Sequence, residues 1–309
     1  MSEYAIESDA LCKFFGRKQA LRHMTLHLPR GGVHAVVGSN GAGKSTFFRI
    51  LLGILSPSSG STRVLGVDSE NLTPETRGKI GLVNEEHTLP GWITVRALID
   101  MHRSLYPLWR QETYDEVIGH YNILEDQKVS QLSRGERAGV NLGLALAQSP
   151  ELLILDEPTL GLDVVAKQAF LESLLFAGQN QERTIIYCSH QMDEVERLAD
   201  NLVIFEDGEL KNMSPPDALW ERISCWMVDD VDVAKVPGLL QVREIDGQKQ
   251  IAVLDQDDGF GAQLQNLGAG AAQQLPISFD RAVNAYLDCN HRTPASSRQA
   301  PATAHRAPA

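Results

Sequence analysis

Two kinds of hydrophobic pattern alternate along the first part of the chain. Short unbroken apolar runs occupy residues 33–37, 152–155 and 184–188, and runs of this length predict buried strands of a parallel sheet. Apolar residues at helical spacing follow the first run, at 47–55, and precede the second, at 140–147. The alternation predicts an α/β fold with a doubly wound sheet, in which ligands bind at the carboxyl ends of the strands.

The segments around these runs predict two further parts of the same unit. Residues 4–36 are expected to form short strands that lead into the first buried run. Residues 92–131 are expected to form a helical block, because apolar residues such as Leu98, Met101 and Leu105 recur at helical spacing.

A boundary follows at Pro215-Pro216, where two prolines interrupt the regular pattern. Residues 216–289 predict a small α+β accessory unit. Residues 290–309 are rich in Pro, Ala and Ser and carry three Arg and no acid, so this tail is expected to be disordered. Within the small unit we expect a short helix around Trp220, strands at 239–242 and 250–254 joined near Asp246-Gly247, and a helix at 279–287.

The loop after the first buried strand has the pattern that binds nucleotide phosphates. It reads Gly38-Ser39-Asn40-Gly41-Ala42-Gly43-Lys44-Ser45-Thr46, which is G-x-x-x-x-G-K-[ST] between a strand and a helix. The glycines let successive backbone N–H groups point at phosphate oxygens, and the helix adds its positive N-terminal end. Lys44 is expected to reach the β- and γ-phosphates, and the Ser45 hydroxyl to bind Mg²⁺. A chance glycine-rich turn is the alternative, which the flanking strand and helix disfavour.

Two carboxylates end the run at 152–155. Asp156 is expected at a strand end, where it can hold Mg²⁺ through water. Glu157 comes next and points differently, so it can act as general base toward the attacking water. Two solvated acids at a strand end are the alternative interpretation.

Two more local patterns complete the set. Ser133 followed by Glu136 is a capping box, which predicts a helix start and a second anion site. Ser189-His190 follows the run at 184–188, so His190 is expected at another strand end beside the nucleotide. Each pattern is ordinary when it stands alone, and the unusual feature is the order of all four.

In this order the motifs resemble those of the ATP-binding subunit of ABC transporters, over roughly residues 4–215. The nine residues from Gly38 to Thr46 are similar to Walker A, and 132–136 to the family signature. Asp156 and Glu157 are similar to Walker B and its catalytic glutamate. The resemblance implies a P-loop NTPase core with a mainly parallel sheet, an antiparallel β subdomain and a helical subdomain at about 92–148. It also implies ATP and Mg²⁺ as ligands.

The same resemblance implies roles for further residues. Phe15 would stack on adenine, Asp163 lies in the D-loop, and His190 is the H-loop histidine. Ser133 and Gly135 of the signature would contact the ATP held by a second subunit, so two copies, or this chain and another ATP-binding subunit, would share two composite sites.

The chain also departs from the family pattern. Glu85 occupies the Q-loop position, where Gln is usual, and is expected beside Mg²⁺ and the γ-phosphate. Arg134 replaces a signature Gly, and Glu136 replaces Gln. The stretches 85–87, 92–95 and 106–109 resemble a bacterial exporter branch that includes antibiotic and peptide export.

Composition limits the classes of partner that the chain can bind. The chain has 309 residues and a formal net charge of −12, which argues against general nucleic-acid binding. Its four cysteines show no metal spacing and are expected to be free thiols, and His87 and His102 are expected at the surface. No stretch reaches the ~18 apolar residues of a membrane helix. The resemblance therefore implies a separate integral membrane subunit, with this chain bound at the cytoplasmic face of the membrane.

Three function classes remain at this point. The first is a transporter motor, the second a non-transport ABC ATPase that acts as a switch on a macromolecular complex, and the third a small-molecule kinase. The single cassette and the absence of sustained heptads disfavour the second class, because ribosomal members usually carry two cassettes and DNA-repair members insert long coiled coils. The signature and His190 disfavour the third. The cargo lies outside what the sequence defines.

Overall fold

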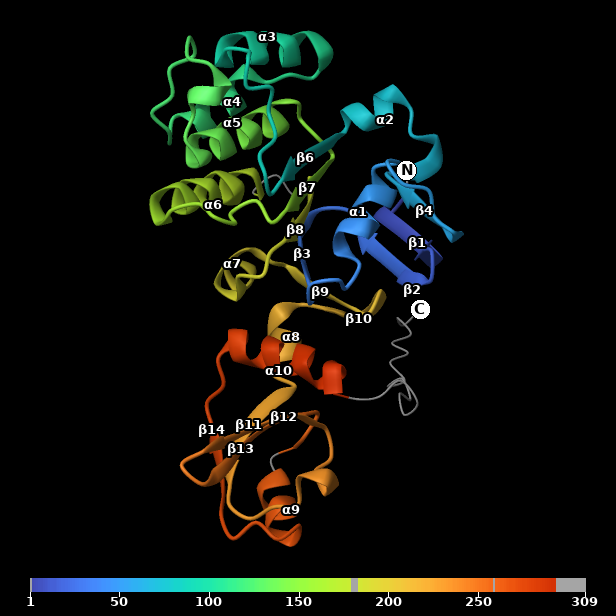
Figure 1. The fold of residues 1–309 in the computed structure, drawn as a ribbon, viewed down its shortest axis with the longest axis vertical. Helices are drawn as coiled ribbons and strands as arrows, with labels where there is room; N and C mark the ends of the chain where they lie inside the picture. Colours follow the sequence, from blue (N-terminus) through green and yellow to red (C-terminus); the bar gives the residue numbers. More distant parts are fainter. Residues whose placement is uncertain (1, 179–182, 258, 293–309) are drawn as a thin grey trace. The chain divides into compact units, whose positions relative to one another are not determined.

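The computed structural model describes residues 2–178, 183–257 and 259–292 (Figure 1). The chain divides into two compact units, Met1–Pro216 and Asp217–Ala309. The first unit contains a central sheet, a smaller antiparallel sheet and a group of helices. The second unit has a sheet of its own.

A six-stranded sheet forms the centre of the first unit, in the order β10-β9-β3-β8-β7-β6. All of its neighbouring pairs are parallel except β9 and β10. The apolar runs lie in its middle: every residue of β8 is buried, as are the first four of β7. The predicted α/β fold with a mainly parallel sheet is therefore confirmed. The strands are β3 (Gly32–Val37), β6 (Ile80–Asn84), β7 (Leu152–Asp156), β8 (Thr184–Cys188), β9 (Asn201–Glu206) and β10 (Glu209–Ser214).

The register of this sheet brings four strand ends level. Asp156 of β7 is paired with Asn84 of β6 on one side and with Cys188 of β8 on the other. Cys188 is in turn paired with Val36 of β3. The residues that follow these strands therefore leave the sheet side by side, at the edge where α/β proteins bind ligands.

A smaller antiparallel sheet, in the order β2-β1-β4-β5, packs with α1 on the central sheet. The rings of Phe47 in α1 and Phe205 in β9 meet edge to face at 5.4 Å. The predicted antiparallel β subdomain is thus confirmed. The elements are β1 (Tyr4–Phe15), β2 (Lys18–Pro29), β4 (Ser59–Val64), β5 (Val67–Asp68) and α1 (Lys44–Leu51).

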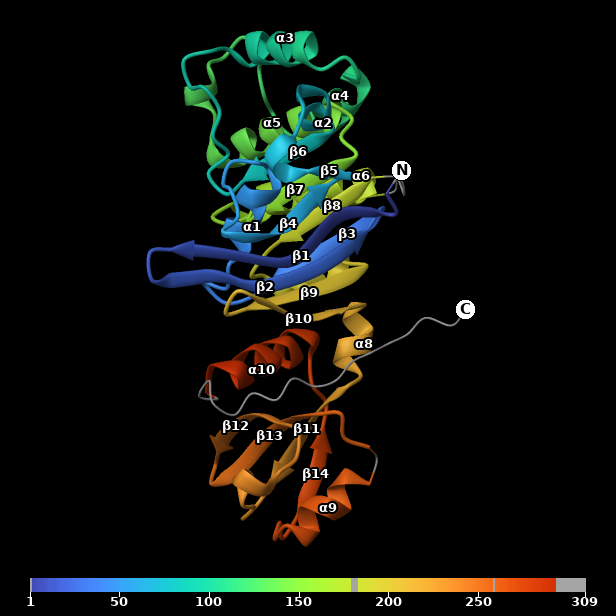
Figure 2. The ribbon, with the colours of Figure 1, turned by 90° about the vertical axis from the view of Figure 1, so that its right-hand side faces the viewer.

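Helices cover the rest of the first unit. Leu142 and Leu146 of α5 and Phe170 of α6 pack against β7. α3, α4 and α5 enclose a separate apolar cluster, and Figure 2 shows them together above the strands. The predicted helical block therefore exists. The helices are α2 (Pro74–Gly78), α3 (Val95–Leu105), α4 (Gln111–Ile118), α5 (Arg134–Ala147), α6 (Val164–Gly178) and α7 (Met192–Leu198).

The predicted start of α5 is confirmed. Ser133 is the N-cap: its Oγ accepts from the Glu136 N–H at 3.2 Å, and the Glu136 carboxylate accepts from the Ser133 N–H at 2.8 Å. The bounds predicted for α1, residues 47–55, are wrong at both ends. The helix begins directly after Gly43 and ends before Gly53, whose positive φ of 64° stops it.

The predicted apolar face of α3 is wrong in its second half. Leu98 is buried, whereas Met101 is 40% and Leu105 is 64% exposed. A helix of 3.6 residues per turn continues the buried stripe of Val95 and Leu98 through His102 instead. His102 is accordingly half-buried and its burial lowers its pKa.

The surface position expected for His87 is also wrong. Its side chain is fully buried and lies against Phe170 of α6, with 6.4 Å between the ring centroids. Burial lowers the pKa of His87 to about 4, and the nearby charges of Arg134 and Arg137 act in the same direction. The histidine is therefore neutral at physiological pH.

The second unit is a four-stranded antiparallel sheet, in the order β12-β13-β11-β14. The two predicted strands and their turn at Asp246-Gly247, where both residues have positive φ, are confirmed as β12 and β13. The sequence interpretation missed β11, β14 and α9. The elements are α8 (Pro216–Trp220), β11 (Ile223–Val228), β12 (Leu239–Ile245), β13 (Gln248–Leu254), α9 (Phe260–Asn266), β14 (Ala272–Leu275) and α10 (Phe279–Arg292).

The last helix corrects the predicted tail. α10 continues to Arg292, so residues 290–292, expected to be disordered, are helical. Residues 293–309 lie outside the described part of the chain. Three cysteines, Cys12, Cys188 and Cys225, are buried free thiols as predicted, and the side chain of Cys289 is not among those described. Within residues 2–178, 183–257 and 259–292, no helix is both long and apolar enough to cross a membrane.

We expect His87 to make the protein less stable as the pH falls from about 6.5 to 4. The unfolded chain binds a proton near the usual pKa of 6.5, whereas the folded chain binds it only near 4. The unfolded state therefore binds more protons in this window, and the free energy of unfolding falls with pH by up to about 3 kcal/mol.

The measurement is the thermal midpoint of wild type and His87→Asn at a series of pH values. Asn is chosen because it does not titrate and tolerates the positive φ of 46° at this position. Wild type should lose more stability than the variant between pH 6.5 and 4. Parallel pH profiles would contradict the assignment.

Candidate functional site

The segment from Gly38 to Thr46 follows β3 and includes the first three residues of α1. Two of its glycines are required by space as well as by conformation. A Cβ on Gly38 would lie 2.2 Å from the carbonyl oxygen of Phe205, and one on Gly43 would lie 2.7 Å from that of Ala20. Gly43 also has a φ of 100°, which side chains rarely adopt. The backbone can therefore curl tightly enough to present its N–H groups to an anion.

Lys44 is held over this loop. Its side chain is buried, and its Nζ donates to the carbonyl oxygens of Gly38 at 2.6 Å and Ser39 at 3.3 Å. An ammonium placed in this way meets whatever negative charge the loop binds. Gly38 and Ser39 thus orient the lysine through their carbonyl groups.

The two carboxylates that follow β7 both reach the same cavity. Asp156 is the last residue of the strand, and Glu157 has a left-handed φ of 51°. The N–H of Glu157 donates to the carbonyl of Cys188 at 3.0 Å, which ties this turn to the end of β8. The turn lets consecutive side chains enter one cavity, although a regular strand would point them to opposite faces.

Glu157 and His190 form a pair. The carboxylate Oε1 lies 3.0 Å from His190 Nε2, and Oε2 accepts from the His190 backbone N–H at 3.3 Å. Burial raises the pKa of Glu157 to about 7, and the neighbouring Asp156 adds to this, while Lys44 opposes it. Burial and the charge of Lys44 lower the pKa of His190. A carboxyl group with a pKa near neutrality is suited to proton transfer.

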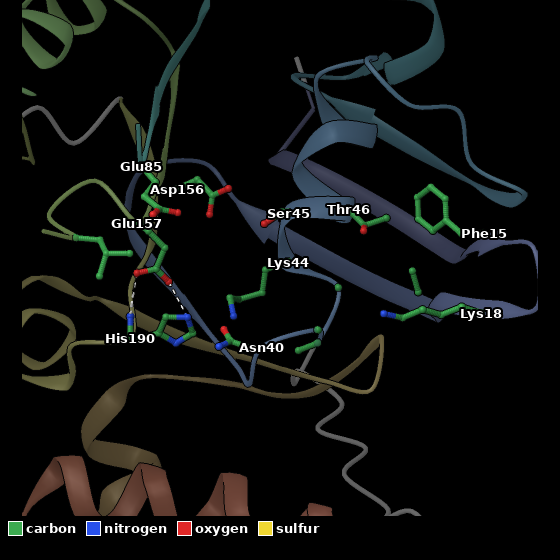
Figure 3. A pocket seen from close by; sticks show the side chains of 15 residues that line it. Phe15, Lys18, Asn40, Lys44, Ser45, Thr46, Glu85, Asp156, Glu157 and His190 are labelled. Carbon is green, nitrogen blue, oxygen red and sulfur yellow. Dashed lines mark hydrogen bonds and ion pairs between the residues drawn. The ribbon is translucent and has the colours of Figure 1, made fainter. Parts of the chain in front are cut away.

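These groups line one cavity of about 720 Å³ (Figure 3). Figure 3 shows Asp156, Glu157 and His190 on one side, Phe15 and Lys18 on the other, and the phosphate-loop residues between them. Phe15 is the last residue of β1, is 48% exposed and has Lys13 Nζ at 5.4 Å from its ring centroid. The lining residues are Phe15, Lys18, Ala20, Asn40, Gly41, Ala42, Gly43, Lys44, Ser45, Thr46, Glu85, Asp156, Glu157, Leu160 and His190.

The residues present fit a divalent cation of the Mg²⁺ type. Ser45, Asp156 and Glu85 bring hydroxyl and carboxylate oxygens into the same cavity, and such hard donors suit Mg²⁺. Among the described residues there is no cluster of three or more His, Cys, Asp or Glu side chains that could hold a metal ion by themselves. A Mg²⁺ ion here would therefore take further ligands from phosphates and water, which is its usual habit.

The predicted signature and D-loop residues do not line this cavity. Ser133, Gly135 and Asp163 line a different hollow of about 220 Å³, together with Glu136 and Ala166. Within one chain, the capped helix end and the phosphate loop are therefore separate surfaces.

The sequence interpretation missed two residues at or near the cavity, Lys18 and Arg134. Lys18 lines the cavity beside Phe15, and its only sequence signal is a basic residue three positions after the aromatic one. Arg134 was noted only as a departure from the family pattern. Its Nη2 donates to the carbonyl of Glu85 at 3.2 Å, and its guanidinium carbon would lie 3.0 Å from a Cβ on Gly161. Arg134 thus contacts both the segment of Glu85, which lines the cavity, and the loop of Gly161, which precedes Asp163.

Comparisons with known proteins agree with this geometry. A family model described as "ABC transporter" matches residues 21–160. The Nod factor export ATP-binding protein I of Rhizobium johnstonii is 34% identical over 238 residues, which cover 74% of this chain and 75% of that protein. The bacitracin transport ATP-binding protein BcrA of Bacillus licheniformis is 30% identical over 222 residues, with 70% and 72% covered. The ABC transporter ATP-binding protein YtrB of Bacillus subtilis is 29% identical over 256 residues, with 82% and 84% covered.

Solved structures share the fold. The structure of an ATP-binding subunit of an ABC transporter superposes with a TM-score of 0.64 at 24% identity, covering 70% of this chain and 92% of that one. A dimeric ATP-binding cassette with ADP and Pi gives a TM-score of 0.60 at 20% identity, covering 68% of this chain and 98% of that one.

Proposed function

This chain belongs to the ABC transporter family of ATP-binding proteins, and we propose that it is the ATP-hydrolysing motor subunit of an exporter whose membrane-spanning part is a separate subunit. The observation that carries the proposal is the single cavity in which Lys44, Asp156, Glu157 and His190 meet. The relatives named for bacitracin and Nod factor transport support export as the direction.

The roles follow from the positions of the groups. Phe15 would stack on the adenine, and the loop from Gly38 to Thr46 would hold the phosphates together with Lys44. Glu157 is the general base that takes a proton from the attacking water. The backbone N–H and Nε2 of His190 hold that carboxylate in place, and His190 would steady the γ-phosphate in the transition state.

Mg²⁺ would be held by Ser45 and Asp156, with Glu85 beside it. When bound, it neutralises negative charge on the β- and γ-phosphates. Glu85 brings one more negative charge to this position than the Gln that is usual in the family.

We further propose that each ATP is shared by two subunits. Ser133, Gly135 and Asp163 line a hollow of their own, so they can serve the ATP of another subunit. The dimeric cassette among the structures of the same fold supports this arrangement. The partner is a second copy or a related ATP-binding subunit.

The docking surface for the membrane subunit is proposed next to the Q-loop. Trp92 lies seven residues after Glu85 and is 79% exposed, which is unusual for so large an apolar side chain. A largely apolar groove of about 710 Å³ lies between α2 and the end of α3. Its lining includes Pro74, Leu105, Tyr106 and Leu108, and also the charged residues Glu75, Arg77 and Lys79. Such surfaces suit an amphipathic helix of a partner. The chain would then act at the cytoplasmic face of the membrane.

We also propose an assignment of domains to the chain. Residues 1–215 are the ATPase domain, with the helical subdomain at about 92–148, and residues 216–289 are an accessory domain. The match to YtrB covers more residues than the first unit contains, so the likeness extends into the second.

The chemical role of Glu157 is tested by Glu157→Gln. The variant should bind ATP as wild type does, because the phosphate loop is unchanged, and should accumulate an ATP-bound dimer. Loss of a general base is expected to lower the hydrolysis rate by roughly 10²–10⁴. Steady-state phosphate release and nucleotide binding are measured on the same preparation. A rate near wild type would remove Glu157 from the role of base.

The shared site is tested by mixing two inactive variants, Lys44→Ala and Ser133→Arg. In a mixed dimer one composite site carries both changes and the other carries neither, so part of the ATPase activity should return on mixing. Formation of mixed dimers is verified with two different affinity tags. A mixture as inactive as either variant, with mixed dimers present, would count against the shared site.

The docking surface is tested by Trp92→Ala. The variant should fold and bind ATP normally, because an exposed side chain contributes little to the core, but should bind the membrane subunit more weakly by about 2 kcal/mol or more. The measurement is co-purification with the membrane subunit. Ile245→Ala, an exposed apolar residue of the second unit, is the control and should bind normally. Normal binding by Trp92→Ala would place the docking surface elsewhere.

A further inference from the structure

One buried carboxylate lies behind the catalytic cavity and has no role in the mechanism above. Glu194 is in α7, and its side chain has no exposed surface. It accepts hydrogen bonds from Thr159 Oγ1 at 2.9 Å and from Ser189 Oγ at 2.8 Å, and also from the hydroxyl of Tyr187. Lys167 Nζ completes the set at 2.9 Å. A buried charge is costly unless it is paired and hydrogen-bonded. The Glu194 carboxylate meets both conditions, with three hydroxyl donors and one ammonium group.

The donors come from the segments that carry the catalytic groups. Thr159 is two residues after Glu157, and Ser189 directly precedes His190. Lys167 is in α6, the helix that begins directly after Asp163. One carboxylate therefore joins the turn after β7, the turn after β8 and the helix of the D-loop.

The turn that contains His190 is fixed from both sides. The Ser189 hydroxyl donates to Glu194 and accepts from the Gln191 backbone N–H at 3.1 Å, so its orientation is determined. His190 lies between these two residues and makes both of its contacts with Glu157 from there. A shift of Ser189 would consequently change the distance between His190 and Glu157.

We propose that Glu194 is a positioning residue for ATP hydrolysis, which holds the turns of Glu157 and His190 at their working separation through Thr159 and Ser189. The proposal rests on the proposed ATPase function. A purely structural role, in which the Lys167–Glu194 pair only fastens α7, is the competing explanation. Buried ion pairs are often neutral for stability, so stability alone does not separate the two.

The chain offers a matched control for the ion pair. Lys167 Nζ also lies 3.2 Å from the carboxylate of Asp193, which is 75% exposed and, among the described contacts, touches neither Thr159 nor Ser189. Asp193→Asn therefore removes one partner of the same lysine and leaves the hydroxyl network intact. Thr159→Ser keeps the hydroxyl donor, whereas Thr159→Val has almost the same shape and lacks it.

The experiment measures kcat and KM for ATP, nucleotide binding and the thermal midpoint of Glu194→Gln, Thr159→Val, Thr159→Ser and Asp193→Asn in the full chain. We expect kcat to fall about tenfold or more in Glu194→Gln and several-fold in Thr159→Val, with KM and nucleotide binding within about twofold of wild type. Positioning errors act on the chemical step in this way. Thr159→Ser and Asp193→Asn should keep the wild-type kcat.

Two results would overturn the proposal. One is a lowered thermal midpoint with an unchanged kcat in Glu194→Gln, which would make the carboxylate structural. The other is an equal loss of kcat in Thr159→Ser and Thr159→Val, which would show that the Thr159 hydroxyl does not position the catalytic groups. If Glu194→Gln does not fold, the Thr159 pair decides alone. A wild-type chain without Mg²⁺-dependent ATPase activity would instead refute the proposed function.

Discussion

The level register of four parallel strands is the constraint on which the site depends. Asn84, Asp156, Cys188 and Val36 are neighbours across β6, β7, β8 and β3. Each strand is followed within two residues by a group of the site or by the loop that holds it. Because β3, β7 and β8 are buried on both faces, a slip of one residue would move their side chains to the opposite layer, disturb its packing and separate these groups. The hydrophobic core of the first unit thus sets the spacing of these groups.

The parts of the site that could be predicted from the sequence are local in the chain. The phosphate loop is nine consecutive residues, and the capping box joins residues three positions apart. The missed parts depend on residues that meet only in the folded protein. Thr159 and Glu194 are 35 residues apart, and Arg134 reaches Glu85 across 49. Pattern and propensity carry no information on such pairs.

The elements of the fold could likewise be predicted where the signal is local in the chain, and were missed where it is not. Long apolar runs predicted β7 and β8 because burial on both faces leaves a plain signal. In the second unit, β11 was missed, although it lies between β13 and β14 at the centre of its sheet. Its sequence mixes Ser, Cys, Trp and Met, and its stability comes from two neighbours that are distant in the chain. Similarly, His87 lies in an acidic loop that suggests exposure, and only α6 packed beside it shows its burial.

Two departures from the usual family pattern touch each other. Arg134 donates to the backbone of Glu85, and its guanidinium group also covers Gly161. The guanidinium group at the start of α5 and the backbone of the unusual acid are therefore adjacent in space.

The separation of the Ser133 hollow from the phosphate-loop cavity has a kinetic consequence. If one ATP needs surfaces from two chains, activity per mole of chain depends on concentration, and dilution below the dimer dissociation constant switches the enzyme off. A membrane complex that binds two copies removes this dependence, because it holds them at a high effective concentration. Assembly on the transporter would then license hydrolysis, and unassembled chains would spare the cell's ATP.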